Sequence, residues 1–386
     1  MALVFRMSSM AGRLRFRSLR PGRNRAILQL SSTSSDVGIA ERTTPLFRSA
    51  CLYHTTMSAT TVKLNDGTEV PAIAYGTGTA LFGKDCANSI KLAIECGFTH
   101  LDGAQAYGNE AFLGEGIRAA GKPRSELYIV TKLKPGLKAA DVKPSLVESL
   151  QKFGMSYRRF QITVLRFLTG PLGIEFVDLF LIHAPPRGPT KPEDGTIQDL
   201  WHAMETVHAE GLAKSIGVSN FTVNDLKAIL PSAKIVPSVN QIEIHPSAPP
   251  TCLPYNVTEM FHRYIWKDAA EPIVKYGREN GNITPASYGG LSPLVRAAGG
   301  PVDEVLPPIV ERLGKVQGKP VTPAQVLSKW VSHKGAIVVT TSSKEARIKE
   351  YLEASNVPDL TAEEIQAIDD AGAKQQKRFF MRQLFE

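Results

Sequence analysis

The sequence predicts one α/β catalytic domain, a closed (β/α)8 barrel preceded by a β-hairpin. From Met57 onward, short β-rich runs alternate with amphipathic helical segments, and such alternation favours parallel strands joined by crossover helices. Eight strand–helix units over roughly 300 residues fit a closed barrel better than an open sheet. No G-x-G-x-x-G follows the first strand, which argues against a Rossmann domain. The expected architecture is therefore the TIM barrel, occupying residues 58–386.

The predicted elements follow one another in a regular order. In residues 61–73, TVKLNDGTEVPAI, Asn65-Asp66-Gly67 lies between two short extended runs, which is typical of a tight hairpin turn. The expected barrel strands are 72–78, 99–104, 127–133, 176–184, 214–220, 237–246, 283–290 and 336–343. The expected helices are 84–97, 110–121, 139–154, 197–211, 223–233, 268–280, 322–335 and 344–355.

Positive charge is concentrated outside this predicted domain. The net charge is +8, but residues 1–57 contain nine Arg, no Lys and only two acids, which is +7. The remaining 329 residues carry about +1, so the barrel offers no basic surface for nucleic acid. No apolar run reaches the roughly 18 residues that a membrane helix needs. We therefore expect neither a nucleic-acid nor a membrane partner.

The first 57 residues form a separate N-terminal extension. Residues 1–35 are rich in Arg and Ser and contain no acid, a composition typical of a mitochondrial transit peptide. The alternative is that translation begins at Met57 and the upstream stretch is a misassigned start. The first interpretation predicts a mitochondrial protein and the second a cytoplasmic one.

The cysteines predict neither a disulfide framework nor a zinc site. The four of them are scattered and form no C-x-x-C pair. A reducing compartment is the simplest setting for them. They are Cys51, Cys86, Cys96 and Cys252.

Four polar side chains stand where predicted strands end. Asp102 and Tyr107 lie in FTHLDGAQAYGNE, Lys132 in LYIVTKL and His183 in FVDLFLIHA. Taken singly, each has an ordinary role: a turn cap, a packed ring, a solvated strand end and a core histidine. In a (β/α)8 barrel, however, the chemistry lies on the loops after the strands. The four together therefore predict an active site.

These four residue types can deliver a proton. A phenol with its reference pKa of about 10 is a poor proton donor at neutral pH. We expect the Lys132 cation to lower the pKa of Tyr107, and Asp102 to balance the buried cation. His183 can hydrogen-bond a substrate oxygen and hold it toward the phenol. Such a site needs no metal.

Five segments resemble successive signatures of the aldo-keto reductases. They are FTHLDGAQAYGNE, LYIVTKL, FVDLFLIHAP, KSIGVSNF and PSVNQIEIHP, and the resemblance runs from about residue 60 to 375. It implies a (β/α)8 barrel that binds NADPH, with NADH possible, and reduces aldehydes or ketones to alcohols. The enzymatic activity that the resemblance implies is alcohol dehydrogenase (NADP+) activity. The resemblance makes Tyr107 the general acid, Lys132 and Asp102 its pKa-setting pair, and His183 the orienting group.

The resemblance also implies a cofactor site. Ser219, Asn220 and Gln241 would hydrogen-bond the nicotinamide carboxamide, and Tyr288 would stack on the nicotinamide ring. Ser342 and Arg347, in TTSSKEARIKE, keep the places of the family's adenosine-phosphate segment, where an arginine and N–H groups at a helix start can bind phosphate. The full set implied is Gly76, Thr77, Ser219, Asn220, Gln241, Tyr288, Leu291, Ser342, Lys344 and Arg347.

The chain departs from the family pattern at three places. Thr340-Thr341 replaces a usual Pro-Lys, which removes one contact to a 2′-phosphate, and Lys344 is the expected substitute. Ala184 and Gly78 each stand where a tryptophan is frequent. Both changes predict a more open pocket and a bulky carbonyl substrate.

Two segments do not fit the family pattern. The flanking sequence follows the family pattern without a break when residues 156–174 and 247–263 are removed. They are either genuine loops or short retained introns translated in frame. Reads of the mature transcript distinguish the two.

Two other outcomes are compatible with the sequence. The same barrel could be an NADPH-binding regulatory or sensor protein with little turnover, since fold does not determine function. Alternatively, the two inserts could prevent folding. The complete set of four residue types favours an enzyme, which we expect to act as a monomer or weak dimer on a small carbonyl substrate.

Overall fold

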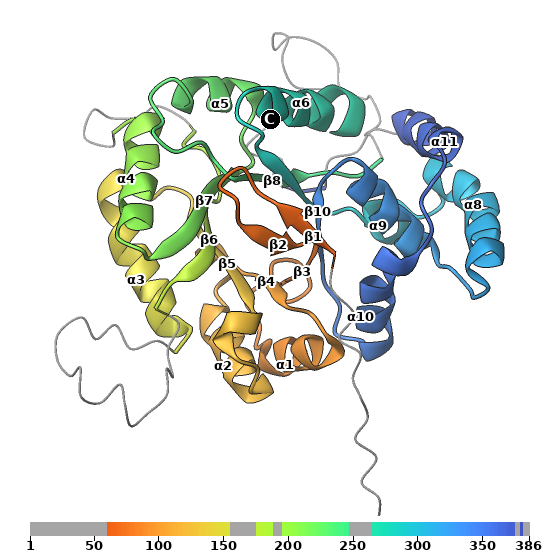
Figure 1. The fold of residues 1–386 in the computed structure, drawn as a ribbon, viewed down its shortest axis with the longest axis horizontal. Coiled ribbons are helices and arrows are strands. Elements are labelled where there is room, and N and C mark those ends of the chain that lie inside the picture. Colours follow the sequence, from red (N-terminus) through yellow and green to blue (C-terminus); the bar gives the residue numbers. More distant parts are fainter. Residues whose placement is uncertain (1–59, 155–174, 188–194, 247–264, 375–378, 381–386) are drawn as a thin grey trace, which may run out of the picture. The chain divides into compact units, whose positions relative to one another are not determined.

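Eight parallel strands close into a barrel in the order β10-β3-β4-β5-β6-β7-β8-β9 (Figure 1). The computed structural model describes residues 60–154, 175–187, 195–246, 265–374 and 379–380. The chain divides into two units, Met1–Thr56 and Met57–Glu386, and the second contains all the described residues. The predicted inserts 156–174 and 247–263 lie outside them. The barrel strands are β3 (Ile73–Gly76), β4 (His100–Asp102), β5 (Tyr128–Leu133), β6 (Val177–Ile182), β7 (Ala213–Ser219), β8 (Val239–Glu243), β9 (Thr284–Tyr288) and β10 (Ile337–Thr340).

The barrel class and the order of its strands are those predicted from the alternation of elements. Every neighbouring pair is parallel, including β10 with β3, which closes the ring. In β4, β5, β6 and β8 every residue is buried, because helices cover the outside and side chains fill the inside. The carboxyl ends of all eight strands therefore meet at one rim.

Helices surround the barrel (Figure 1). Several begin with a capping box in which a threonine and a residue three positions later bond each other's backbone N–H, as in Thr196 with Asp199. None of the helices in the described ranges is long and apolar enough to cross a membrane. The helices are α1 (Ala87–Cys96), α2 (Glu110–Ala120), α3 (Val142–Lys152), α4 (Ile197–Ala209), α5 (Val223–Ile229), α6 (Glu271–Glu279), α7 (Ser292–Arg296), α8 (Pro301–Gln317), α9 (Pro323–His333), α10 (Glu345–Leu352) and α11 (Ala362–Ala373).

The sequence did not predict α7, α8 and α11. The region between the strand expected at 283–290 and the helix expected at 322–335 contains α7 and α8. Pro307 and Pro308 lie inside α8, where proline normally interrupts a helix. α8 persists because Val302, Leu306, Ile309 and Leu313 form a buried apolar face at helical spacing.

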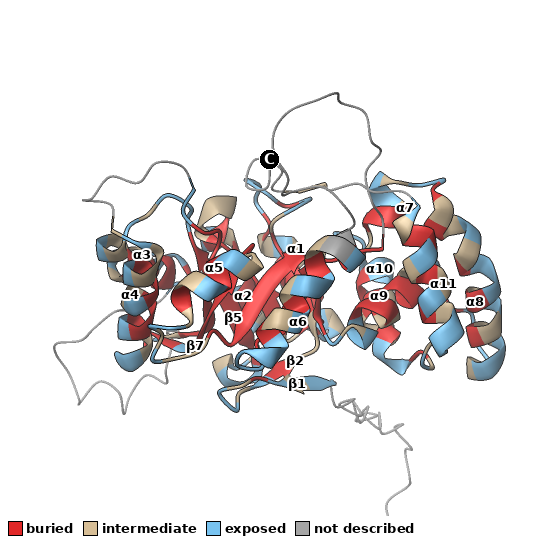
Figure 2. Cartoon of the chain, turned by 90° about the horizontal axis from the view of Figure 1, so that it is seen from above, coloured by how far each residue is buried: buried red, intermediate tan, exposed pale blue. Residues whose placement is uncertain are grey.

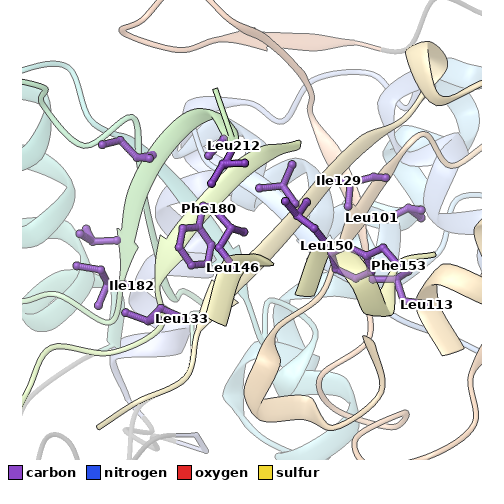
Figure 3. Close-up of a cluster of buried hydrophobic side chains, with 14 of the residues drawn as sticks. Leu101, Leu113, Ile129, Leu133, Leu146, Leu150, Phe153, Phe180, Ile182 and Leu212 are labelled. Carbon is purple, nitrogen blue, oxygen red and sulfur yellow. The ribbon is translucent and has the colours of Figure 1, made fainter. Parts of the chain in front are cut away.

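The largest cluster of buried side chains lies between the strands and the surrounding helices. In Figure 2 the buried residues fill the barrel and the inner faces of the helices. Figure 3 shows part of this cluster, where Leu146 and Leu150 of α3 lie near Ile129 and Phe180 of the strands. Burying such a side chain stabilises the fold by roughly 1.5–3 kcal/mol.

The predicted N-terminal hairpin is present and lies at the barrel end opposite the carboxyl ends of the strands. Asp66, in its turn, accepts hydrogen bonds from Ser215 Oγ (2.6 Å) and Ser238 Oγ (3.0 Å), which lie near the starts of β7 and β8. Asn65 Nδ2 donates to the Pro237 carbonyl at 3.0 Å. The carboxyl ends of the strands stay clear of this hairpin. Its strands are β1 (Thr61–Lys63) and β2 (Glu69–Pro71).

Candidate active site

The structure brings the four predicted polar residues together at the carboxyl ends of neighbouring strands. Asp102 ends β4, Lys132 is the penultimate residue of β5, and His183 directly follows β6. Tyr107 ends a short 3-10 helix after β4. Asp102, Lys132 and His183 are buried, whereas Tyr107 keeps part of its surface exposed.

The Lys132 ammonium group is at the centre of the site. Its Nζ donates to Asp102 Oδ1 (2.7 Å), to the carbonyl of Gly103 (2.8 Å) and, at 3.4 Å, to the hydroxyl of Tyr107. An ammonium group has three donors, and these acceptors use all of them. The charged form of Lys132 is therefore matched to its surroundings, as a buried ion pair requires.

The expectation that Lys132 lowers the pKa of Tyr107 is wrong for this arrangement. Loss of water around the Tyr107 hydroxyl, followed by the nearby carboxylate of Asp102, raises its pKa well above the usual value. Burial also lowers the pKa of Lys132, while Asp102 opposes that change. The Lys132 cation, 3.4 Å from the hydroxyl, does not offset this loss of hydration. Tyr107 therefore keeps its proton at neutral pH.

His183 faces the ring of Tyr107. The two ring centroids are 5.3 Å apart, with an angle of 81° between the planes. Burial, with the Lys132 charge as a second cause, lowers the pKa of His183 to about 3. Its imidazole is therefore neutral at physiological pH. Nδ1 of this ring is buried without a hydrogen-bond partner among the described residues.

The lowered pKa of His183 predicts a loss of stability in acid. The unfolded chain takes up this proton near pH 6.5, whereas the folded chain does so only near 3. The free energy of unfolding should therefore fall between these two values as the pH falls. Against a His183→Gln variant, the wild type should lose about 1.4 kcal/mol for each pH unit below 6. Urea unfolding at several pH values measures this difference.

A matched control is His333→Gln, because His333 is exposed in the last turn of α9. This variant should follow the wild type at every pH. A constant offset between wild type and His183→Gln from pH 7 to 4.5 would contradict the prediction.

The residues expected around a nicotinamide form one hydrogen-bonded chain that ends on Asp102. Gln241 Nε2 donates to Asp102 Oδ2 at 2.8 Å, and Ser219 Oγ donates to the Gln241 carbonyl at 2.7 Å. Asn220 Nδ2 donates to Ser219 Oγ at 3.0 Å, and the Tyr288 hydroxyl donates to Asn220 Oδ1 at 2.6 Å. Ser219 and Tyr288 end β7 and β9, Asn220 directly follows β7, and Gln241 is the middle residue of β8.

The hydrogen-bond donors of this series of residues suit a carboxamide. Asn220 uses both of its amide hydrogens, the second on the carbonyl of His183 at 2.8 Å. The bonds above use only one amide hydrogen of Gln241, so this side chain is the better placed to give a donor and an acceptor to a bound amide. Asn220 also has φ = 60°, a left-handed conformation that asparagine tolerates better than most residues.

The other residues expected near the nicotinamide lie close by. Gly76 ends β3 and pairs with Asp102 in the sheet. Thr77 is buried, and its N–H donates to the carbonyl of Asp102 at 3.0 Å. Leu291 is partly buried just before α7.

The residues expected around an adenosine phosphate gather at the start of α10. Ser342 is buried, and its Oγ accepts from the backbone N–H of Lys344 at 3.1 Å. Lys344 and Arg347 are exposed. The first N–H groups of a helix lack partners within it. These groups and two cations fit a phosphate.

Gly78, where the sequence predicts an opening, lies directly against the ring of Tyr107. A Cβ built at this position would lie 2.5 Å from Cζ of Tyr107 and 2.8 Å from its hydroxyl oxygen. The ring of Tyr107 therefore already fills the space that a side chain would need. Ala184, the other expected opening, is buried.

Sequence reasoning missed two groups that support the site. The carbonyl of Gly103 accepts from Lys132, and a backbone acceptor leaves no signal in sequence. Asn109 donates to the carbonyls of Thr77 (3.0 Å) and Leu81 (2.8 Å), which fixes the loop after β3. Its place in AYGNE, two residues after Tyr107, was the available signal.

Comparison with known proteins identifies the family. The model described as "Aldo/keto reductase family" matches residues 73–162 and 170–373, with a gap inside the segment 156–174. An NAD/NADP-dependent indole-3-acetaldehyde reductase of Schizosaccharomyces pombe is 35% identical over 83% of this chain and 98% of its own. A D/L-glyceraldehyde reductase of Hypocrea jecorina is 33% identical over 83% of this chain and 90% of its own.

A solved structure gives the same result. The aldo-keto reductase of Bombyx mori in complex with NADP has a TM-score of 0.63 and 28% identity, over 81% of this chain and 92% of that one. The family model covers most of the barrel, and the relatives align over nearly their full length. The chain therefore belongs to the aldo/keto reductase family.

Proposed function

We propose that the protein reduces aldehydes or ketones to alcohols with NADPH, with Tyr107 as the proton donor. Relatives named as NAD(P)H-dependent reductases support the reaction class, and one of them is named for both NAD and NADP. NADH is therefore a second candidate cofactor. Lys344 and Arg347 at the start of α10 favour the extra phosphate of NADPH.

The cofactor, when bound, supplies a hydride to the carbonyl carbon of the substrate. Neutral His183 donates a hydrogen bond to the carbonyl oxygen and holds it toward Tyr107. As charge develops on that oxygen, the phenol gives up its proton, because an alkoxide is a stronger base than a phenolate. Lys132 then stabilises the phenolate from 3.4 Å, and Asp102 keeps the lysine in place.

The observation that carries the proposal is the set of three contacts made by Lys132 Nζ, to Asp102, Gly103 and Tyr107. The test is NADPH oxidation by the full chain with a panel of aldehydes and ketones. We expect turnover with at least one class of carbonyl compound. NADPH binding without turnover of any compound in the panel would instead favour a sensor. A melting temperature that NADPH leaves unchanged would exclude both the reductase and the sensor.

An exposed aromatic ring beside Tyr107 supports an apolar, aromatic substrate. The side chain of Phe82 is 55% exposed, and its ring centroid lies 6.1 Å from that of Tyr107. Its loop is anchored, since Gly83 N donates to the carbonyl of Tyr107 at 2.8 Å. An exposed phenyl group on an anchored loop is a ready contact for a flat substrate. The indole-3-acetaldehyde reductase among the relatives is named for such a substrate.

Phe82→Ala should therefore change specificity. We expect kcat/KM for phenylacetaldehyde to fall roughly tenfold, because one apolar contact is lost, and kcat/KM for glyceraldehyde to stay within about twofold. The matched control is Val316→Ala, an exposed apolar residue (63%) on α8. Equal losses for both aldehydes would show that Phe82 supports the loop and does not touch the substrate.

A further inference from the structure

A buried carboxylate at the rim formed by the carboxyl ends of the strands binds the backbone of two residues near the C-terminus. Glu243 ends β8 and is 1% exposed. Its Oε1 accepts from the backbone N–H of Phe379 at 2.9 Å, and its Oε2 accepts from that of Phe380 at 3.3 Å. His245 Nε2 also donates to Oε1, at 3.0 Å. The carboxylate thus binds successive N–H groups through both oxygens.

Burying a charged group costs free energy unless its hydrogen bonds are replaced. The proposed reduction has no step for Glu243, because the proton comes from Tyr107 and the orientation from His183. The bonds to Phe379 and Phe380 do use the charge, since hydrogen bonds to an ionised acceptor are roughly twice as strong as neutral ones. Binding this segment of chain is therefore a physical reason for a carboxylate at the end of β8.

The two phenylalanine rings extend this contact to neighbouring elements. The Phe379 ring centroid lies 5.4 Å from that of His245. The Phe380 ring lies 5.7 Å from that of Tyr288 at 85°, and the Arg296 guanidinium lies 4.4 Å from the centre of the Phe380 ring. By binding the backbone of Phe379 and Phe380, Glu243 therefore determines where the Phe380 ring contacts Tyr288.

Tyr288 is thereby held at both ends. Its hydroxyl donates to Asn220 Oδ1 at 2.6 Å, and its ring contacts Phe380 edge to face. A ring held in one orientation loses little conformational entropy when a flat ligand stacks on it.

We propose that Glu243 is a positioning residue that holds Phe380 against Tyr288 and so slows release of the nicotinamide cofactor. This rests on the proposed function, in which Tyr288 stacks on the nicotinamide. Glu243 itself touches neither substrate nor cofactor. Its effect passes through the backbone of Phe379 and Phe380 to the ring of Tyr288.

The test is the rate of NADPH release from full-length variants, followed by the fluorescence of bound NADPH during a chase with excess NADP+. Glu243→Gln replaces one carboxylate oxygen with an amide that opposes a backbone N–H, and should speed release about tenfold. Phe380→Ala removes the ring and should have a similar effect. The double variant should release NADPH no faster than Phe380→Ala alone, because Glu243 acts through that ring.

A matched control exists on the outside of the barrel. Glu205 of α4 is also buried, and its Oε1 accepts from the successive N–H groups of Lys234 (2.6 Å) and Ile235 (2.9 Å). Glu205→Gln makes the same chemical change and should leave the release rate within about twofold of the wild type.

Two results would overturn the inference. One is an unchanged release rate in Glu243→Gln. The other is that Glu243→Gln speeds NADPH release by the same factor in the wild type and in Phe380→Ala. That result would mean that Glu243 acts through the barrel end and not through the Phe380 ring. A wild-type chain that binds no NADPH would instead overturn the proposed function, so the two failures are distinguishable.

Discussion

Tyr107→Phe is expected to lower kcat by two to four orders of magnitude, the usual contribution of a general acid, and to leave NADPH binding within about twofold. The substitution removes only the hydroxyl group. The ring can keep its contacts with Phe82 and His183, and Lys132 keeps Asp102 and Gly103 as acceptors. The pocket should therefore keep its shape and lose only its proton donor.

Steady-state NADPH oxidation and a fluorescence titration of NADPH measure the two quantities separately. Tyr128→Phe is the matched control, because Tyr128 is buried at the start of β5, at the end of the barrel that the hairpin approaches. This variant should keep wild-type turnover. Substantial turnover by Tyr107→Phe would mean that another group or water protonates the substrate oxygen.

Lys132→Met is expected to reduce both stability and turnover. Removing the ammonium leaves the Asp102 carboxylate buried with an unbalanced charge, and breaking such a pair typically costs about 3–5 kcal/mol. The phenolate of Tyr107 also loses its stabilising cation. We expect urea unfolding to show the loss of stability and NADPH oxidation to fall to near background.

The exposed pair of Lys143 and Glu210 (2.7 Å) provides the control, since surface ion pairs contribute about 0–1 kcal/mol. Lys143→Met should therefore be nearly neutral. The double variant Lys132→Met with Asp102→Asn should regain part of the lost stability, because no unbalanced charge remains, while staying inactive. A Lys132→Met protein as stable as wild type would contradict the buried ion pair.

Most of the fold could be predicted because its signals are local. Barrel strands such as β6 (VDLFLI) and β10 (IVVT) are short apolar runs, and helices such as α4 begin at a capping residue. α8 was missed because Pro307 and Pro308 are local signals against a helix, whereas its stability comes from packing of its buried face. Local signals fail where packing overrides them.

The members of the site could be predicted, but its energetics could not. Strict alternation of strands and helices makes the strands parallel, and parallel neighbours bring Asp102, Lys132 and His183 to one rim. The direction of the pKa change at Tyr107 depends on burial and on the distances among Tyr107, Asp102 and Lys132. The sequence contains neither quantity.

Local patterns in the sequence were enough to predict the barrel, the rim on which the polar residues stand and the family. They could not show that Tyr107 fills the space beside Gly78, or that Glu243 binds the backbone of Phe380, 137 positions away. The physical reason is range: hydrophobic periodicity acts over a few residues, whereas steric exclusion and hydrogen bonding act between atoms that only folding brings together.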